Sequence, residues 1–75
     1  MRRAGTVLRI AQGRLVVRAP GPEPPDFGET VLDEHLESVG TIVDVFGPVD
    51  RPYLTVVPLD SINPPSLLNE PLYLR

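Results

Sequence analysis

The chain has 75 residues, ten acidic side chains, seven arginines and neither lysine nor cysteine, and its formal net charge at pH 7 is −3. This length allows one compact domain, residues 1–75, whose folding buries only about 60% of the surface of the unfolded chain. The lack of cysteine excludes a disulfide framework and a thiolate metal site. The apolar runs fall far short of the roughly 20 residues that span a bilayer. The basic residues 1–3 are not followed by an apolar signal core, so we expect a cytoplasmic protein with no membrane partner and no targeting segment.

Charge is distributed unevenly along the chain. Five arginines precede the first acidic residue, Glu23, and only two arginines follow it. Such asymmetry can mark a nucleic-acid surface. The pattern favours the simpler interpretation that the two halves lie against each other and pair, because small β domains bring their ends together. An RNA-facing surface remains the alternative.

The first predicted element is a β-hairpin, in which residues 6–11 and 14–18 flank the turn Gln12-Gly13. Gly13 can adopt the positive φ that a two-residue turn needs. The turn predicts the pairs Ala11–Arg14, Ile10–Leu15 and Leu8–Val17. One face of the hairpin then carries Leu8, Ile10, Leu15 and Val17. The other face carries three arginines as candidate RNA-facing residues, Arg9, Arg14 and Arg18.

A proline-rich loop follows, at about residues 19–29. Its four prolines lack the N–H group that a strand ladder needs. We expect an extended surface loop that serves as a stiff connector, with a proline-rich ligand segment as the less favoured alternative. Residues 30–33 predict a short strand, and residues 34–37 predict a turn.

The strongest strand is predicted at residues 38–46, which are rich in β-branched and aromatic side chains. Both of its faces are partly apolar, so it is either buried on both sides or leaves one face for a partner. Residues 47–52 predict a stiff hairpin connection to a strand at 52–57. A loop at 58–66 leads to a last strand at 71–74, which we expect to be an edge. No segment has helical periodicity.

Six short strands separated by turn signals indicate an all-β fold, a small six-stranded antiparallel β-barrel that is closed or nearly closed. Closure removes strand edges, which otherwise promote aggregation.

Groups that could perform chemistry are few. His35 lies beside Glu34 and Glu37, but this spacing does not converge well on one metal ion, so a solvated polar loop is favoured over a metal site. There is no nucleophile–base set and no phosphate-binding glycine loop, so we expect no catalytic residue, no metal, no cofactor and no small-molecule substrate. The four aromatic residues, Phe27, Phe46, Tyr53 and Tyr73, are not expected to cluster with arginines as a base-stacking platform requires.

Asp44 is unusual because it lies between two valines of the strongest strand. A buried carboxylate is costly unless it is paired or hydrogen-bonded. It could cap the turn at Gly47 or pair with an N-terminal arginine; contact with a cation on a partner is less favoured.

The segment from residue 39 to 53 contains a rigid loop that presents Phe46, Val49 and Tyr53. A stiff apolar tip loses little entropy on docking, which favours binding. An equally good interpretation is that these residues only close one end of the barrel.

The same segment carries a family resemblance. Its pattern V-G-x-I-x-D-V-F-G-P-V-x-x-P-Y resembles the glycine/arginine-rich-domain ("Gar-one") subunit of box H/ACA ribonucleoproteins. The opening G-x-V-L, the V-L-D before the motif and the closing L-Y-L are also similar, so the resemblance covers nearly the whole chain. The chain lacks repeated Gly-Arg tails, so it looks like the archaeal, core-only form. Its acidic charge argues against a direct RNA-binding role.

The resemblance implies a barrel of the translation-factor (reductase/isomerase/elongation-factor) type and a non-catalytic role in RNA-guided pseudouridylation of rRNA during ribosome biogenesis. The partner it implies is the pseudouridine synthase, whose catalytic domain the subunit binds and whose mobile loop it biases for substrate loading and product release. Contact with the guide RNA is indirect, within the complex. The matching candidate docking residues are Val43, Val45, Phe46, Gly47, Pro48, Val49, Pro52 and Tyr53. The alternative is a ribosome-maturation or translation-factor-like barrel that binds RNA or a ribosomal protein directly; an independent enzyme is the least favoured reading.

Overall fold

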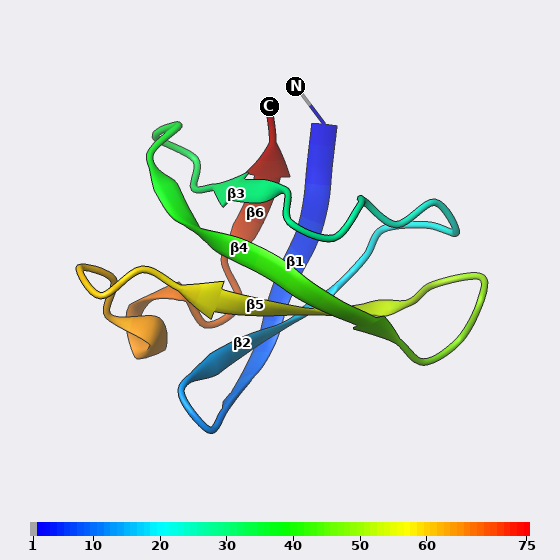
Figure 1. The fold of residues 1–75 in the computed structure, drawn as a ribbon, viewed down its shortest axis with the longest axis horizontal. Helices are drawn as coiled ribbons and strands as arrows, with labels where there is room; N and C mark the ends of the chain where they lie inside the picture. The colour runs from blue at the N-terminus through cyan, green and yellow to red at the C-terminus, as the bar shows by residue number, and fades with distance from the viewer. Residues whose placement is uncertain (1) are drawn as a thin grey trace.

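The computed structural model describes residues 2–75, which form six strands and one short 3-10 helix (Figure 1). The elements are β1 (Arg2–Ala11), β2 (Arg14–Arg18), β3 (Thr30–Leu32), β4 (Ser38–Phe46), β5 (Tyr53–Pro58), η1 (Pro64–Leu67) and β6 (Pro71–Leu74). Neighbouring strands are antiparallel, and the sheet closes in the order β1-β2-β5-β4-β3-β6. The predicted six-stranded antiparallel barrel is confirmed.

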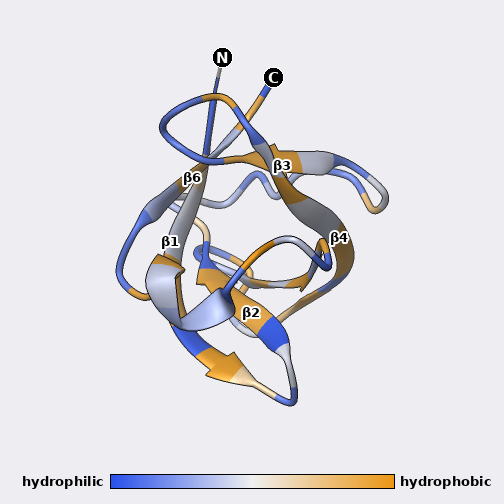
Figure 2. Ribbon diagram, turned by 90° about the vertical axis from the view of Figure 1, so that its left-hand side faces the viewer, coloured by the Kyte–Doolittle hydropathy of each residue, from blue (hydrophilic) through white to orange (hydrophobic). Residues whose placement is uncertain are grey.

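The core fills the inside of the barrel, because alternate residues of each strand point inward. Its largest members come from distant parts of the chain, and Leu15, Leu54 and Leu72 have no exposed surface. β2 departs from simple alternation, because its three central residues are all buried, and Figure 2 shows this hydrophobic stretch between hydrophilic residues at the two ends of the strand. The alternation thus separates an apolar interior from a more polar outer face.

The β1–β2 hairpin turns at the predicted dipeptide, where Gln12 and Gly13 have φ values of 53° and 75°. Positive φ at both central residues matches the right-handed twist of the flanking strands. The predicted pairs next to the turn, Ala11–Arg14 and Ile10–Leu15, are confirmed.

The predicted pair Leu8–Val17 is wrong. Val17 pairs with Val7, because the register shifts at Leu8 in a β-bulge. The bulge leaves Leu8 46% exposed, whereas Val7 is fully buried in the core. A single extra residue therefore exchanges the inward-facing side chain of β1.

The last strand is not an edge, contrary to expectation, because β6 pairs with β1 on one side and β3 on the other. Closure brings the backbones close together at Gly5, whose φ is +149°. A Cβ atom at Gly5 would collide with the carbonyl oxygen of Arg18. Glycine is therefore required where β1 passes between β6 and β2.

The long connections are tied to the barrel. In the proline-rich loop, the Ala19 N–H donates to the Pro52 carbonyl at 2.9 Å and the Gly28 N–H donates to the Ile42 carbonyl at 2.8 Å. The loop thus runs along β4 as a tethered connector. The predicted loop at 58–66 contains the start of η1, where prolines occupy the first helical positions. No helix in residues 2–75 is long and apolar enough to cross a membrane.

Candidate docking surface

Three side chains from neighbouring strands form one row across the barrel. Arg18 of β2 pairs with Tyr53 of β5, and Tyr53 pairs with Phe46 of β4. The ring centroids of Phe46 and Tyr53 lie 5.4 Å apart with 27° between the ring planes, and the guanidinium carbon of Arg18 lies 5.2 Å from the Tyr53 centroid. We call these three residues the aromatic row. Ring stacking and the attraction of a cation to an aromatic face stabilise this arrangement without a partner.

The row lies on the outer face of the barrel. Its immediate neighbours along the strands, Val17 and Leu54, are fully buried in the core, so strand alternation directs the row outward. Phe46 is 40% exposed, while Tyr53 and Arg18 are half-buried. A partner approaching this face therefore meets an exposed aromatic edge beside a cation.

Gly47 makes room for the row at the end of β4. It has a φ of +89°, and a Cβ atom there would lie 2.6 Å from Cδ2 of the Tyr53 ring. A larger residue would have to strain its own backbone and push the ring aside. Gly47 thus allows both the sharp exit from β4 and the position of the central ring.

The hairpin at residues 47–52 projects beyond the ends of β4 and β5 (Figure 1). Its turn is closed by the Arg51 N–H, which donates to the Pro48 carbonyl at 3.3 Å. Nε of Arg51 donates to the Ala19 carbonyl at 3.2 Å, which ties the hairpin to the start of the proline-rich loop. At the tip, Val49 is 89% exposed. The hairpin therefore exposes an apolar side chain to solvent, while hydrogen bonds hold its backbone in place.

The proline-rich loop adds a second exposed aromatic side chain near this end of β4. Phe27 is 66% exposed, in a turn where the Asp26 N–H donates to Oε2 of Glu29 at 2.7 Å. Pro24, Pro25, Asp26, Phe27 and Val45 line one open depression. No feature of the sequence pattern singled out Phe27, because its position depends on how the loop runs along β4.

The structure divides the predicted docking residues by exposure. Val43, Phe46, Gly47, Pro48 and Val49 are exposed, Val45 and Tyr53 are half-buried, and Pro52 is buried. Val45 packs against the core, so its contribution to the surface is small. Pro52 supports the base of the hairpin through its carbonyl group, which binds the Ala19 N–H.

The expected pairing between the basic and acidic parts of the chain is wrong. Within residues 2–75 no arginine forms an ion pair with a carboxylate. Arg9 and Arg14 are exposed, and they share the outer face with Arg18, because Arg9 lies opposite Val16. The three candidate RNA-facing arginines therefore lie on one face of the sheet, with their charges unpaired within the described chain.

The aromatic residues were expected to stay apart from the arginines, and this expectation is also wrong. Phe46 and Tyr53 stack beside Arg18 because β2 pairs with β5, two strands that are distant in the chain. Because side chains alternate along each strand, all three side chains lie on the outer face of the barrel. Only the register between β2 and β5 brings them together, and local sequence patterns do not contain that register.

Asp44 is exposed, so its presence in β4 carries no burial cost. Its Oδ1 accepts a hydrogen bond from the Val45 N–H at 2.9 Å. It forms no ion pair with an N-terminal arginine and no side-chain hydrogen bond to the turn at Gly47 within the described residues. Asp44 thus adds a negative charge close to the aromatic row.

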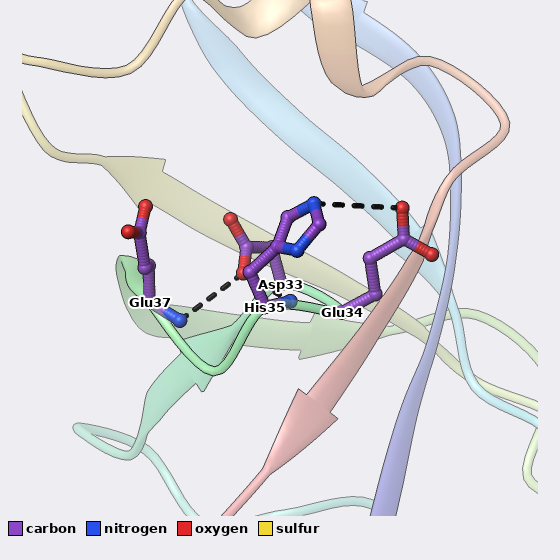
Figure 3. A network of polar contacts seen from close by, with 4 residues as sticks. All are labelled: Asp33, Glu34, His35 and Glu37. Atoms are coloured by element: carbon purple, nitrogen blue, oxygen red, sulfur yellow. Dashed lines mark hydrogen bonds and ion pairs between the residues drawn. The ribbon is translucent and has the colours of Figure 1, made fainter.

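The acidic turn around His35 is a solvent-exposed network (Figure 3). Oδ1 of Asp33 accepts hydrogen bonds from the N–H groups of His35 at 2.8 Å and Glu37 at 3.1 Å. Nε2 of His35 lies 3.9 Å from a carboxylate oxygen of Glu34, and both side chains are mostly exposed. Asp33 therefore organises the turn. No group of three histidine or acidic residues in the described chain is placed to hold a metal ion.

Comparison with known proteins places this barrel in a family. A family model described as the Gar1/Naf1 RNA binding region matches residues 1–74. The chain belongs to this family. The chain resembles the H/ACA ribonucleoprotein complex subunit GAR1 of Chaetomium globosum and the H/ACA ribonucleoprotein complex subunit gar1 of Neosartorya fischeri. Each is 28% identical over 58 residues, which are 77% of this chain and 28% of the relative.

A further relative is an uncharacterized protein of Methanothermobacter thermautotrophicus, 28% identical over 70 residues, which cover 92% of this chain and 74% of that protein. The chain thus spans little more than a quarter of the length of the two GAR1 relatives. The similarity to them concerns the barrel region.

The role of Gly47 generates a prediction about stability. We expect Gly47→Ala to lower the free energy of unfolding by about 2–3 kcal/mol, since it adds an overpacked contact to the cost of a positive φ. Urea unfolding measures the loss, and the near-ultraviolet circular dichroism of tyrosine reports the displaced ring.

Gly13→Ala is the matched control, because Gly13 has a φ of +75° and open space around its Cβ position. It should cost only about 1 kcal/mol and leave the tyrosine signal unchanged. Equal losses from the two substitutions would show that Gly47 does not make room for Tyr53.

Proposed function

We propose that this chain is a non-catalytic subunit of an H/ACA ribonucleoprotein, in which it binds the catalytic domain of the pseudouridine synthase. Membership of the Gar1/Naf1 family supports this role, as does the similarity to two relatives that are named as H/ACA ribonucleoprotein subunits. In the proposal the synthase and a guide RNA carry out RNA-guided pseudouridylation, and this chain supplies no reacting group.

The observation that carries the proposal is the aromatic row continued by the braced 47–52 hairpin. Phe46 and Val49 expose apolar surface, and Tyr53 is already fixed between Phe46 and Arg18. Docking such a surface costs little conformational entropy, because its side chains are held before contact. Aromatic residues surrounded by a polar rim are also typical of the energetic centre of an interface.

The size of a stable interface indicates how far the contact extends. A standard interface buries about 800 Å² on each partner. That is about a sixth of the 4610 Å² surface of this chain, which is more than three side chains provide. We therefore include the hairpin tip at Val49 and the flanking Val43 in the docking surface, together with Phe27 of the proline-rich loop.

An effect on the synthase's mobile loop requires differential binding. A subunit that binds two loop states equally well shifts neither, whereas moving a 1:99 population to 99:1 takes about 10⁴-fold preference. Val49 in the hairpin is the side chain of this chain best placed to distinguish loop states, because its exposed fraction of 89% is the highest among the large apolar side chains of the described residues. The proposed action is thus a population shift without chemistry by this chain.

The docking surface predicts the effect of two combined substitutions. Val49→Asp with Tyr53→Asp should weaken binding to the synthase, in the absence of RNA, by at least about 100-fold, because two charges replace an apolar contact and its stacked support. Isothermal titration calorimetry measures the affinity, and a thermal melt establishes that the variant is folded.

The matched control is Leu36→Asp with Leu68→Asp, which makes the same charge change at exposed leucines away from the hairpin. The control should bind like the wild type. Unchanged affinity in the folded Val49/Tyr53 variant would remove the docking assignment.

Direct RNA binding is the second candidate function, and the arginine face favours it. Arg9 and Arg14 are exposed and form no ion pair within the described residues, and the family model is described as an RNA binding region. Unpaired cations on one sheet face suit contact with phosphates. The net charge of −3 opposes strong binding by the chain alone.

This candidate predicts the salt dependence of binding to a structured RNA hairpin. The association constant K falls as salt rises, so the slope of log K against log salt is negative. If Arg9 and Arg14 contact phosphates, Arg9→Gln and Arg14→Gln should each make this slope less negative by about 0.7–0.9. Fluorescence anisotropy over a salt series measures the slope, with Arg75→Gln as the control. Slopes that match the wild type would exclude these arginines from phosphate contact.

A further inference from the structure

Arg18 is a cation that the fold holds in place but does not neutralise. Its guanidinium lies over the Tyr53 ring, and its Nε is buried with no hydrogen-bond partner. No carboxylate within residues 2–75 forms an ion pair with it. The residue as a whole is half-buried, and the described chain supplies no carboxylate to its guanidinium, so a partner for this charge would come from outside the chain.

A second arginine strengthens the positive charge at this end of the row. Thr6 of β1 pairs with Arg18 of β2, and Oγ1 of Thr6 accepts a hydrogen bond from Nη2 of Arg3 at 2.9 Å. Arg3 and Arg18 therefore both lie next to Thr6. The outer face runs from this cationic end, through Tyr53 and Phe46, to the apolar hairpin tip.

The opposite end of the surface carries two carboxylates and one cation, Arg51, whose Nε is bound to the Ala19 carbonyl. Asp50 is exposed beside Val49 in the hairpin, and Asp44 is exposed on β4 two residues before Phe46. A phosphate backbone crossing this surface would meet both carboxylates, which repel it. A protein can instead place one carboxylate opposite the cationic end and apolar or basic groups elsewhere. The charge pattern therefore favours a protein ligand over RNA at this position.

We infer that Arg18 is the specificity-determining cation of the docking surface and receives a carboxylate that the synthase presents beside apolar side chains. The inference rests on the proposed function and deepens it. The contact with the Tyr53 ring holds the Arg18 guanidinium beside the row. A guanidinium can present paired N–H donors to a carboxylate. A partner lacking this carboxylate would leave the cation unpaired on docking, and this cost discriminates against it.

The test compares Arg18 variants in binding to the purified pseudouridine synthase without RNA, by calorimetry at low and moderate salt. Arg18→Gln should weaken binding by about 10- to 100-fold, and Arg18→Glu should weaken it further. Arg18→Lys keeps the charge but not the planar fork, so it should recover only part of the loss and keeps the test decisive if the other variants fold poorly.

Arg14→Gln is the matched control, because Arg14 lies on the same strand and face but outside the aromatic row. It should change the affinity by less than about threefold. Full affinity in folded Arg18→Gln, or equal losses from Arg14→Gln and Arg18→Gln, would overturn the inference. So would unchanged synthase binding combined with weaker binding to an RNA hairpin, which would assign Arg18 to a phosphate.

The Val49/Tyr53 double variant separates the two proposals. If it loses synthase binding while Arg18→Gln does not, the docking surface stands and the role of Arg18 is wrong. If the wild-type chain does not bind the synthase at all, both the proposed function and the inference about Arg18 are wrong.

Discussion

The register that joins β2, β5 and β4 is the constraint on which the rest of this structure depends. The pairs Val17–Leu54 and Leu54–Val45 place apolar side chains inside the barrel. The adjacent pairs Arg18–Tyr53 and Tyr53–Phe46 then necessarily face outward in one row. Because side chains alternate along a strand, a slip of one residue would disrupt the core and the outer row together. Stability and binding are therefore linked through one set of backbone hydrogen bonds.

The β4–β5 hairpin and the proline-rich loop add exposed apolar surface next to the aromatic row. The hairpin between β4 and β5 projects Val49, and its base is held to Ala19 by hydrogen bonds in both directions. These same bonds fix the start of the proline-rich loop, whose tip exposes Phe27. Exposed apolar groups, an unpaired arginine and two nearby carboxylates are thus collected around one end of the barrel. In the proposed function, such a surface would combine hydrophobic contact with a charge pattern that selects its partner.

The sequence predicted what local chemistry determines. Short apolar runs separated by turn signals identified six strands, and the turn at Gln12-Gly13 identified the first pairs of the opening hairpin. The sequence pattern was sufficient for these features because they are local. It did not predict the bulge at Leu8, because that bulge depends on how β1 must curve to close the barrel. It also missed the pairing of Arg18 with Tyr53, since β2 and β5 meet only through the long-range topology. The stiff hairpin was predicted because its prolines and glycine are adjacent in the chain, while the exposure of its apolar tip was one of two equal interpretations. The aromatic row was not predicted.

The central claim is that the synthase docks on the row and the 47–52 hairpin, and nuclear magnetic resonance of the chain titrated with the unlabelled synthase tests it most directly. The account predicts that the amide signals of Val49, Asp50 and Arg51 and the ring signals of Tyr53 shift or broaden early in the titration. The amides of the acidic turn at residues 33–37 should stay unchanged. Early changes in that turn, with an unperturbed hairpin and Tyr53 ring, would contradict the account.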